Sequence, residues 1–266
     1  MYDNVLIIHN ARGQYSEGTK LNKKTMKFIF GEDNLVIYDD FKNIKTGMYK
    51  LGNICFNYLN TYKHSIFFGG DHLTSFGTIL GCLKKYNNNF KIVWMDAHTD
   101  IHNFDTSPSK NLHGMVVNFL LNHTYPDIPR LLPNQILYVG IRSVEKEEWN
   151  FIKKWNIDYI KMEDINIDLN RTINKIKKFV KSNNVHVSLD VDVFDPSIMF
   201  STGTREPDGM YLDQFEVILE TIKCNSNHFS TDIMEFNSKI GKKDKVQISI
   251  ETIKNCIKTI GDNECR

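Results

Sequence analysis

Residues 92–100 have the sequence Ile-Val-Trp-Met-Asp-Ala-His-Thr-Asp, in which four apolar residues are followed at once by a polar segment with two aspartates and a histidine. An apolar run of this length is typical of a β-strand that is buried on both faces of a parallel sheet. In such sheets, ligands bind beyond the carboxyl ends of the strands. The stretch therefore predicts a parallel sheet with a polar site at its carboxyl edge.

Similar apolar runs recur along the whole chain, and segments that can form helices separate them. The other predicted strands are Val5–Ile8, Leu35–Tyr38, Ser65–Phe68, Ile136–Val139, Asp158–Ile160, Val185–Leu189 and His228–Ile233. The predicted helices are Gly47–Thr61, Thr74–Lys85, Gly114–Leu121, Lys146–Trp155, Asn170–Ser182, Leu212–Lys223 and Lys245–Ile260. This alternation predicts an α/β fold with helices on both faces of a parallel sheet. No repeat or linker divides the sequence, so we expect residues 1–266 to form a single domain.

The composition excludes several classes of protein. The 33 lysines and arginines nearly balance 32 aspartates and glutamates, so no basic excess indicates nucleic-acid binding. No apolar run approaches the roughly 18–20 residues that a membrane-spanning helix needs. The first residues, MYDNVLIIHN, lack the basic flank and cleavage site of a signal peptide. With five cysteines and no CxxC spacing, we expect reduced thiols and a cytoplasmic location.

Polar side chains with the chemistry of metal ligands follow three of the predicted strands, and a carboxylate follows a fourth. His72 comes after the third strand, and Glu235 comes after the last. In an extended chain, residues two apart point to the same side. We therefore expect two sets of side chains to converge, with His72, on one point: Asp96, His98 and Asp100 in the first set, and Asp190 and Asp192 in the second.

Two imidazoles and four carboxylates are too many ligands for one tetrahedral zinc ion, and no thiolate accompanies them. They suit two divalent ions that share bridging carboxylates, and mixed nitrogen and oxygen ligands favour Mn²⁺. Two such ions, roughly 3.5–4 Å apart, can hold a hydroxide nucleophile. A magnesium phosphotransfer site is the main alternative, but it requires a phosphate-binding loop. The nearest candidate, residues 13–20, places Thr19 before Lys20 and fails that pattern.

Six motifs carry a resemblance to a known family. They are GGDH at 69–72, DAHTD at 96–100, NLHG at 111–114, SLDVDVFDPS at 188–197, STGT at 201–204 and DIMEFN at 232–237. In their residues and in their order along the chain, these motifs resemble the ureohydrolase family of arginases and agmatinases, most closely the arginases. The resemblance implies a three-layer αβα fold with a single, mainly parallel sheet. It also implies a homotrimer or homohexamer.

The resemblance assigns a role to each residue of the cluster. One Mn²⁺ is held by His72, Asp96, Asp100 and Asp190, and the other by His98, Asp96, Asp190 and Asp192, which gives two Mn²⁺ per chain. A bridging hydroxide attacks the guanidinium carbon of the substrate. Asp100 orients the hydroxide and accepts its proton, and His113 passes a proton to the leaving amine. Glu235 pairs with the guanidinium group, and Thr204 lies near the same group.

The far end of the substrate matches the family less closely. The resemblance places His102, Asn103, Ser109 and Asn111 on the side of the substrate carboxylate, although the family has asparagine where this chain has His102. It places Glu145 and Glu148 at the α-amino group, where the family has an aspartate in place of Glu145. Residues 205–209, Arg-Glu-Pro-Asp-Gly, replace the glycine-rich stretch that usually follows TGT.

The resemblance thus implies a manganese amidinohydrolase that converts L-arginine to L-ornithine and urea, with a small guanidino molecule as its binding partner and neither nucleic acid nor membrane. The departures at His102 and Glu145 leave open the same chemistry on agmatine, another guanidino acid or formiminoglutamate. A second alternative is an inactive scaffold of the same fold, against which the intact set of six ligand positions argues.

Overall fold

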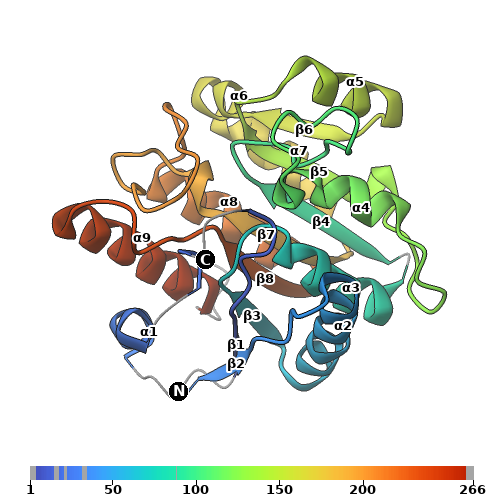
Figure 1. Cartoon of the computed structure of the whole chain (residues 1–266). Coiled ribbons are helices and arrows are strands. Elements are labelled where there is room, and N and C mark those ends of the chain that lie inside the picture. Colours follow the sequence, from blue (N-terminus) through green and yellow to red (C-terminus); the bar gives the residue numbers. More distant parts are fainter. Residues whose placement is uncertain (1–3, 15–17, 21–22, 32–34, 88, 262–266) are drawn as a thin grey trace.

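The computed structural model describes residues 4–14, 18–20, 23–31, 35–87 and 89–261. Its centre is an eight-stranded sheet in which the strands follow the order β2-β1-β3-β8-β7-β4-β5-β6 and every pair is parallel (Figure 1). The strands are β1 Val5–Ile8, β2 Val36–Tyr38, β3 His64–Phe68, β4 Phe90–Met95, β5 Ile136–Ile141, β6 Asp158–Lys161, β7 Asn184–Asp190 and β8 His228–Met234. All eight predicted strands are confirmed, as is the single parallel sheet.

Helices cover both faces of the sheet and make it the middle of three layers, as predicted (Figure 1). Successive residues of a strand point to opposite faces. Val93 and Met95 of β4 therefore pack in one core cluster, and Ile92 and Trp94 pack in the other. The first cluster includes residues of α1 Lys23–Phe30, α6 Met162–Ile167, α7 Leu169–Val180, α8 Leu212–Asn225 and α9 Lys243–Gly261. The second includes residues of α2 Ile44–Thr61, α3 Thr74–Tyr86, α4 Val116–Asn122 and α5 Lys146–Trp155.

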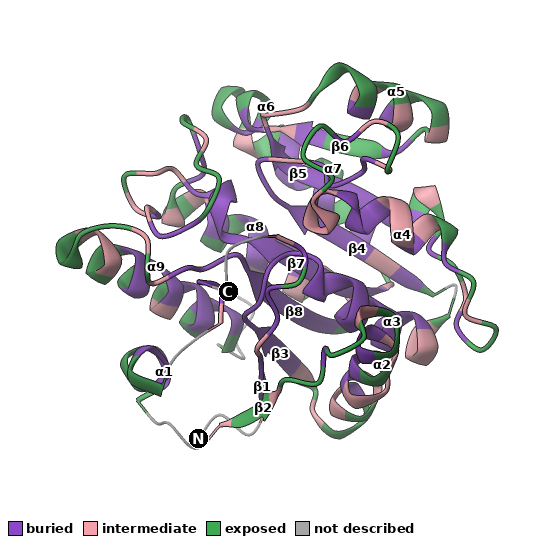
Figure 2. Cartoon of the chain, in the orientation of Figure 1, coloured by how far each residue is buried: buried purple, intermediate pink, exposed green. Residues whose placement is uncertain are grey.

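The burial pattern explains why the strands lack polar alternation. Six of the strands have buried residues at nearly every position, whereas the edge strands β2 and β6 are largely exposed or half-buried (Figure 2). The helices present a buried face to the sheet and an exposed face to solvent. Continuous apolar sequence at β4 and β7 thus follows from burial on both sides.

Several elements differ from the sequence-based prediction. The short helices α1 and α6 were not predicted, because eight and six residues give too few turns for a clear period. The predicted helix Gly114–Leu121 is a 3₁₀ turn, η1 Leu112–Met115, followed by α4. The thiol prediction holds for Cys55, Cys82 and Cys256, which are free and buried, but it is wrong for Cys224, which is disulfide-bonded.

In the part of the chain that the structure describes, no helix has both the length and the apolar character that crossing a bilayer requires.

Candidate metal centre and pocket

Four neighbouring strands in the middle of the sheet supply the polar groups of the site. In the order β3-β8-β7-β4, these strands lie side by side and point the same way. His72 follows β3, Glu235 follows β8, Asp190 ends β7 and Asp96 follows β4. Parallel pairing brings all four ends to one edge, so residues up to 163 positions apart in sequence come into contact. The predicted site at the carboxyl edge is therefore formed by the sheet order itself.

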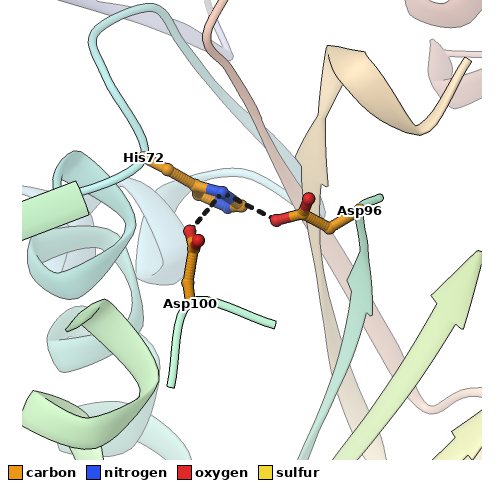
Figure 3. A group of neighbouring side chains, drawn as sticks. All are labelled: His72, Asp96 and Asp100. Carbon is orange, nitrogen blue, oxygen red and sulfur yellow. Dashed lines mark ion pairs between the residues drawn. The ribbon is translucent and has the colours of Figure 1, made fainter. Parts of the chain in front are cut away.

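The first group of candidate ligands surrounds the Nδ1 atom of His72. This nitrogen lies 3.1 Å from Asp96 Oδ2, 3.0 Å from Asp100 Oδ2 and 3.1 Å from Asp190 Oδ2. Figure 3 shows His72, Asp96 and Asp100 pointing toward one another from three separate segments. One ion placed among these atoms could contact a nitrogen and three carboxylate oxygens, which is the arrangement predicted for the first metal position.

The second group lies on the other side of Asp96. His98 Nδ1 is 3.1 Å from Asp192 Oδ2 and 3.4 Å from Asp96 Oδ1. The two oxygens of Asp96 thus face different groups, as a bridging carboxylate requires. In each group, the candidate atoms of three residues lie within 4.8 Å of one another, and Asp96 belongs to both. Asp190 contacts the first group, while its Oδ1 accepts a hydrogen bond from the backbone N–H of Asp192 at 2.8 Å.

The side chains converge for a reason other than the expected extended backbone. Asp100 has a φ of 47°, in the left-handed region, and Asp192 lies in the 3₁₀ turn η3 Val191–Val193. The prediction that residues two apart share a side of an extended chain is therefore wrong in its geometry, although the residues that it named do lie close together. Tight turns replace the extended strand after both Asp96 and Asp190. In each turn the first aspartate accepts a backbone N–H two residues later: Asp96 Oδ1 accepts that of His98 at 2.7 Å, and Asp190 Oδ1 accepts that of Asp192 at 2.8 Å.

The loop that carries His72 depends on a glycine. Gly70 has a φ of 92°, and a Cβ atom at this position would lie 2.3 Å from Oγ1 of Thr74. Any other residue would therefore clash as well as adopt an unfavourable backbone conformation. The Gly-Gly pair of the GGDH motif thus turns the chain sharply and places His72 over the end of the sheet.

The cluster is crowded with charge and nearly closed to water. The side chain of His72 is fully buried, and its Nδ1 has no hydrogen-bond partner among the described residues, although three carboxylate oxygens surround it. Burial raises the pKa of Asp190 well above its usual range, and repulsion from Asp192 and Asp96 raises it further. Burial likewise raises the pKa of Asp192, to about 6. Three buried carboxylates around one imidazole nitrogen fit a bound cation, because a cation would offset the repulsion among the acids and bind the nitrogen as well.

The side chain of Trp94 contacts two of the candidate ligands, His72 and Asp96. Its ring stacks on His72 with 4.2 Å between the ring centroids and 18° between the planes. Its indole N–H donates to Asp96 Oδ2 at 2.9 Å. Since Trp94 and Asp96 are two residues apart at the end of β4, the signal was present in the sequence, but an indole in an apolar run does not distinguish packing from support of a ligand.

A second polar group adjoins the cluster and is centred on Glu235. The Oε1 atom of Glu235 accepts the backbone N–H of His72 at 2.9 Å and lies 3.1 Å from His113 Nδ1. Its Oε2 atom accepts the side-chain amide of Gln14 at 2.8 Å, a partner that the sequence did not reveal. Glu235 has a φ of 65°, and strained backbone of this kind is concentrated at functional sites.

The pairing with Glu235 changes the charge state of His113. Burial would lower the pKa of this imidazole, but the hydrogen bond and charge of Glu235 raise it to about 9. With a pKa of about 9, His113 is protonated at neutral pH while it contacts Glu235.

A pocket of about 340 Å³ adjoins the cluster, and His113 and Glu235 are among its lining residues. Of the residues predicted for the substrate, the structure places His102, Ser109, Glu145, Glu148, Thr204 and Glu235 on its wall. Asn103 and Asn111 are not among the lining residues, and the side chain of Asn103 accepts the N–H groups of Asp105 and Thr106 within its own loop. Glu206, which the sequence did not single out, also lines the pocket. Seven lining residues are acids, and no lysine or arginine is present among the described lining residues, so the pocket favours a cation.

Glu145 and Glu148, the two glutamates predicted to contact the α-amino group of the substrate, differ in how accessible their carboxylates are to a ligand. Glu148 is buried; its carboxylate accepts the backbone N–H of Glu145 at 2.8 Å and the hydroxyl of Thr99 at 2.5 Å. It therefore caps the start of α5. The side chain of Glu145 is 54% exposed, and its carboxylate lies 3.5 Å from His102 Nε2. Glu145 is accordingly the more available of the two carboxylates for a substrate.

Comparisons with known proteins agree with this architecture. The model of the Arginase family matches residues 8–257. The arginase of Entamoeba histolytica is 34% identical over 207 residues, which cover 74% of this chain and 68% of that protein. The arginase of Plasmodium berghei is 35% identical over 192 residues, or 66% of this chain and 53% of that protein. A crystal structure of Entamoeba histolytica arginase with L-ornithine superposes with a TM-score of 0.82 at 24% identity, covering 96% and 97% of the two chains.

The charge of the cluster predicts that divalent ions stabilise the fold. Removing metal with EDTA should lower the thermal midpoint, and adding Mn²⁺ should raise it by roughly 10 °C, because binding at about 1,000 times Kd contributes about 4 kcal/mol. Asp192→Asn should reduce this rise, whereas Asp208→Asn, at an exposed aspartate in a nearby loop, should leave it unchanged. A midpoint that does not respond to metal would contradict a cation site in this cluster.

Proposed function

Because the chain belongs to the arginase family, whose members are metal-dependent hydrolases of guanidino substrates, we propose that it hydrolyses L-arginine to L-ornithine and urea. The observation that carries this proposal is the position of Asp96, whose two oxygens face two adjoining groups of ligand atoms. A site for one ion would not need a carboxylate divided in this way. The alternative function, an inactive scaffold of the same fold, would not require a cluster of buried acids that repel one another.

The residues present fit two Mn²⁺ ions. His72, Asp96, Asp100 and Asp190 would hold the first, and Asp96, His98 and Asp192 would hold the second, with Asp190 as a further ligand to it. Nitrogen and oxygen ligands without sulfur favour manganese. When bound, the two ions supply a hydroxide nucleophile at neutral pH, because they lower the pKa of water.

The side chains around the cluster can bind the substrate and move protons. Glu235 would accept the N–H groups of the planar guanidinium with its two oxygens, as carboxylates do in paired hydrogen bonds. Asp100 would accept the proton that the water loses as its oxygen forms a bond to the guanidinium carbon. The bond between the guanidinium carbon and the substituted nitrogen then breaks, and His113 would protonate that nitrogen as it leaves. The products are urea and an amine.

The contact between His113 and Glu235 supports this order of events. With no substrate bound, the 3.1 Å contact keeps His113 protonated. A guanidinium that binds Glu235 would replace this contact and remove the charge that raises the pKa of the imidazole. His113 would then give up its proton more readily, at the stage where the leaving amine needs one.

The outer part of the pocket would bind the amino-acid end of arginine. Glu145 provides an available carboxylate for the α-amino group, and Ser109 and Thr204 provide neutral hydroxyls. His102 also lines the pocket, with Nε2 3.5 Å from Glu145 Oε2 and 3.7 Å from Glu148 Oε1, and its imidazole would donate to the α-carboxylate. We further propose a cytoplasmic homotrimer or homohexamer, as the family resemblance implies.

The proposal predicts substrate-dependent urea release. Purified protein loaded with Mn²⁺, with its metal content measured on the same sample, should release urea from L-arginine faster than from agmatine or from another guanidino acid, and it should not act on formiminoglutamate. A preference for agmatine would retain the chemistry and change the substrate. Protein that holds two ions and releases urea from none of these compounds would contradict the proposed activity.

Glu235→Gln should separate binding of metal from binding of substrate. The variant keeps the shape of the side chain but loses the charge that pairs with the guanidinium. Because a hydrogen bond to a charged group contributes about 1.5–3 kcal/mol, kcat/KM for arginine should fall about ten- to hundredfold. Its metal content should equal that of the wild type. Glu163→Gln, at an exposed glutamate outside the pocket, is the control and should change neither quantity. Wild-type kcat/KM in Glu235→Gln would refute the assigned role.

A further inference from the structure

The two oxygens of the Glu235 carboxylate have different partners, and one partner comes from the opposite end of the sequence. Oε1 accepts the backbone N–H of His72 at 2.9 Å, and Oε2 accepts the side-chain amide of Gln14 at 2.8 Å. Gln14 follows β1 and lies 221 positions before Glu235. It is not among the described residues that line the pocket. Gln14 is therefore placed to act on a substrate through Glu235.

The segment that carries Gln14 is anchored to the loop of the GGDH motif. The carboxylate of Asp71 accepts the backbone N–H of Gly13 at 2.5 Å and the side-chain amide of Asn10 at 3.3 Å. The backbone oxygen of Asn10 in turn accepts the backbone N–H of Asp71 at 3.2 Å. Gly13 leaves no room for a side chain, since a Cβ atom there would lie 2.9 Å from the carboxylate of Asp71. Because Asp71 and Asn10 are fully buried, these bonds fix the chain immediately before Gln14.

The same segment contacts two other loops of the site. The backbone oxygen of Gly13 accepts the backbone N–H of His113 at 3.3 Å. A Cβ atom on Gly203, in the STGT motif, would lie 3.8 Å from Oε1 of Gln14, so the amide oxygen lies beside that loop. Gln14 thus reaches from the STGT motif to Glu235: its amide oxygen lies beside the first, and its NH₂ group contacts the second.

A neutral amide is a suitable partner for a carboxylate that binds a cation. An ionised carboxylate has about four lone pairs on its two oxygens, so Oε2 of Glu235 can accept a second donor beside Gln14. A guanidinium group forms two parallel hydrogen bonds with a carboxylate that lies in its plane. Donors on separate oxygens, from His72 and Gln14, limit the rotation of the Glu235 carboxylate and so set that plane. Because the amide carries no charge, it does not neutralise the carboxylate that the substrate needs.

We propose that Gln14 is a positioning residue of the guanidinium subsite, because it fixes the plane of the Glu235 carboxylate. The hydrogen bonds of Asp71 fix the segment that carries Gln14 in turn. This inference rests on the proposed function, because it requires that Glu235 binds a guanidinium group. The subsite thus includes a residue from the segment after β1, outside the six motifs of the sequence.

The test is Gln14→Met in the Mn²⁺-loaded, full-length protein, measured in two backgrounds. Methionine keeps the length of the side chain but has no hydrogen-bond donor. In the wild-type background, kcat/KM for L-arginine should fall about five- to tenfold, the effect of one hydrogen bond. In the Glu235→Gln background, the same change should have almost no further effect, because that variant has already lost the carboxylate through which Gln14 acts. Gln14→Asn keeps an amide that is too short to reach Oε2, and it should match Gln14→Met.

Further measurements separate positioning from general destabilisation. The metal content of Gln14→Met should equal that of the wild type. The inhibition constant of L-ornithine, the proposed product, should also be unchanged, because ornithine lacks the guanidinium group that Glu235 binds. Gln247→Met is the matched control: it removes an exposed 3.0 Å hydrogen bond from Gln247 to Glu251 on α9, and it should keep wild-type kinetics.

The possible results distinguish this inference from the proposed function. Wild-type kcat/KM in Gln14→Met, or an equal loss in both backgrounds, would overturn the inference. An inhibition constant for L-ornithine that rises as far as kcat/KM falls would also overturn it, because it would indicate a general disturbance of the pocket. If the wild-type protein with bound metal releases no urea, the proposed function fails. Calorimetric binding of L-arginine then tests the inference on its own, and it should weaken in Gln14→Met by the same factor.

Discussion

Mutual repulsion among buried carboxylates is the constraint on which the site depends. Asp96, Asp100, Asp190 and Asp192 lie at the end of adjoining strands, and all four are buried or nearly so. Burial removes the water that would otherwise screen their charges. The fold cannot separate them, because pairing of β4 with β7 fixes Asp96 and Asp190 at the same edge. A bound cation would offset this repulsion and thereby stabilise the arrangement of the strands.

The surrounding structure tolerates local strain in order to direct these side chains. Asp100 and Glu235 both have left-handed backbone conformations, which each cost about 1–3 kcal/mol for residues other than glycine. Extensive apolar burial on both faces of the sheet offsets this cost. Trp94 connects the apolar core to the acid cluster, because its side chain packs in the core, stacks on His72 and donates a hydrogen bond to Asp96.

The sequence was a good guide to the strands and to the identity of the clustered residues. Apolar runs such as Ile92–Met95 mark strands buried on both faces, and polar residues that follow such runs must lie at the carboxyl edge. The sequence did not predict the contact of Gln14 with Glu235 or that of Glu206 with His98, because each joins segments that only the sheet order brings together. It also placed Asn103 in the pocket, whereas local hydrogen bonds hold that side chain within its own turn.

The most direct test of the account is the location of metal in crystals of the protein grown with Mn²⁺. Anomalous diffraction at the manganese absorption edge should show two peaks per chain, roughly 3.5–4 Å apart. One peak should lie beside Nδ1 of His72, the other beside Nδ1 of His98, and Asp96 should contact both. A single peak, or peaks that do not share Asp96, would contradict the claim that the acid cluster is a site for two ions.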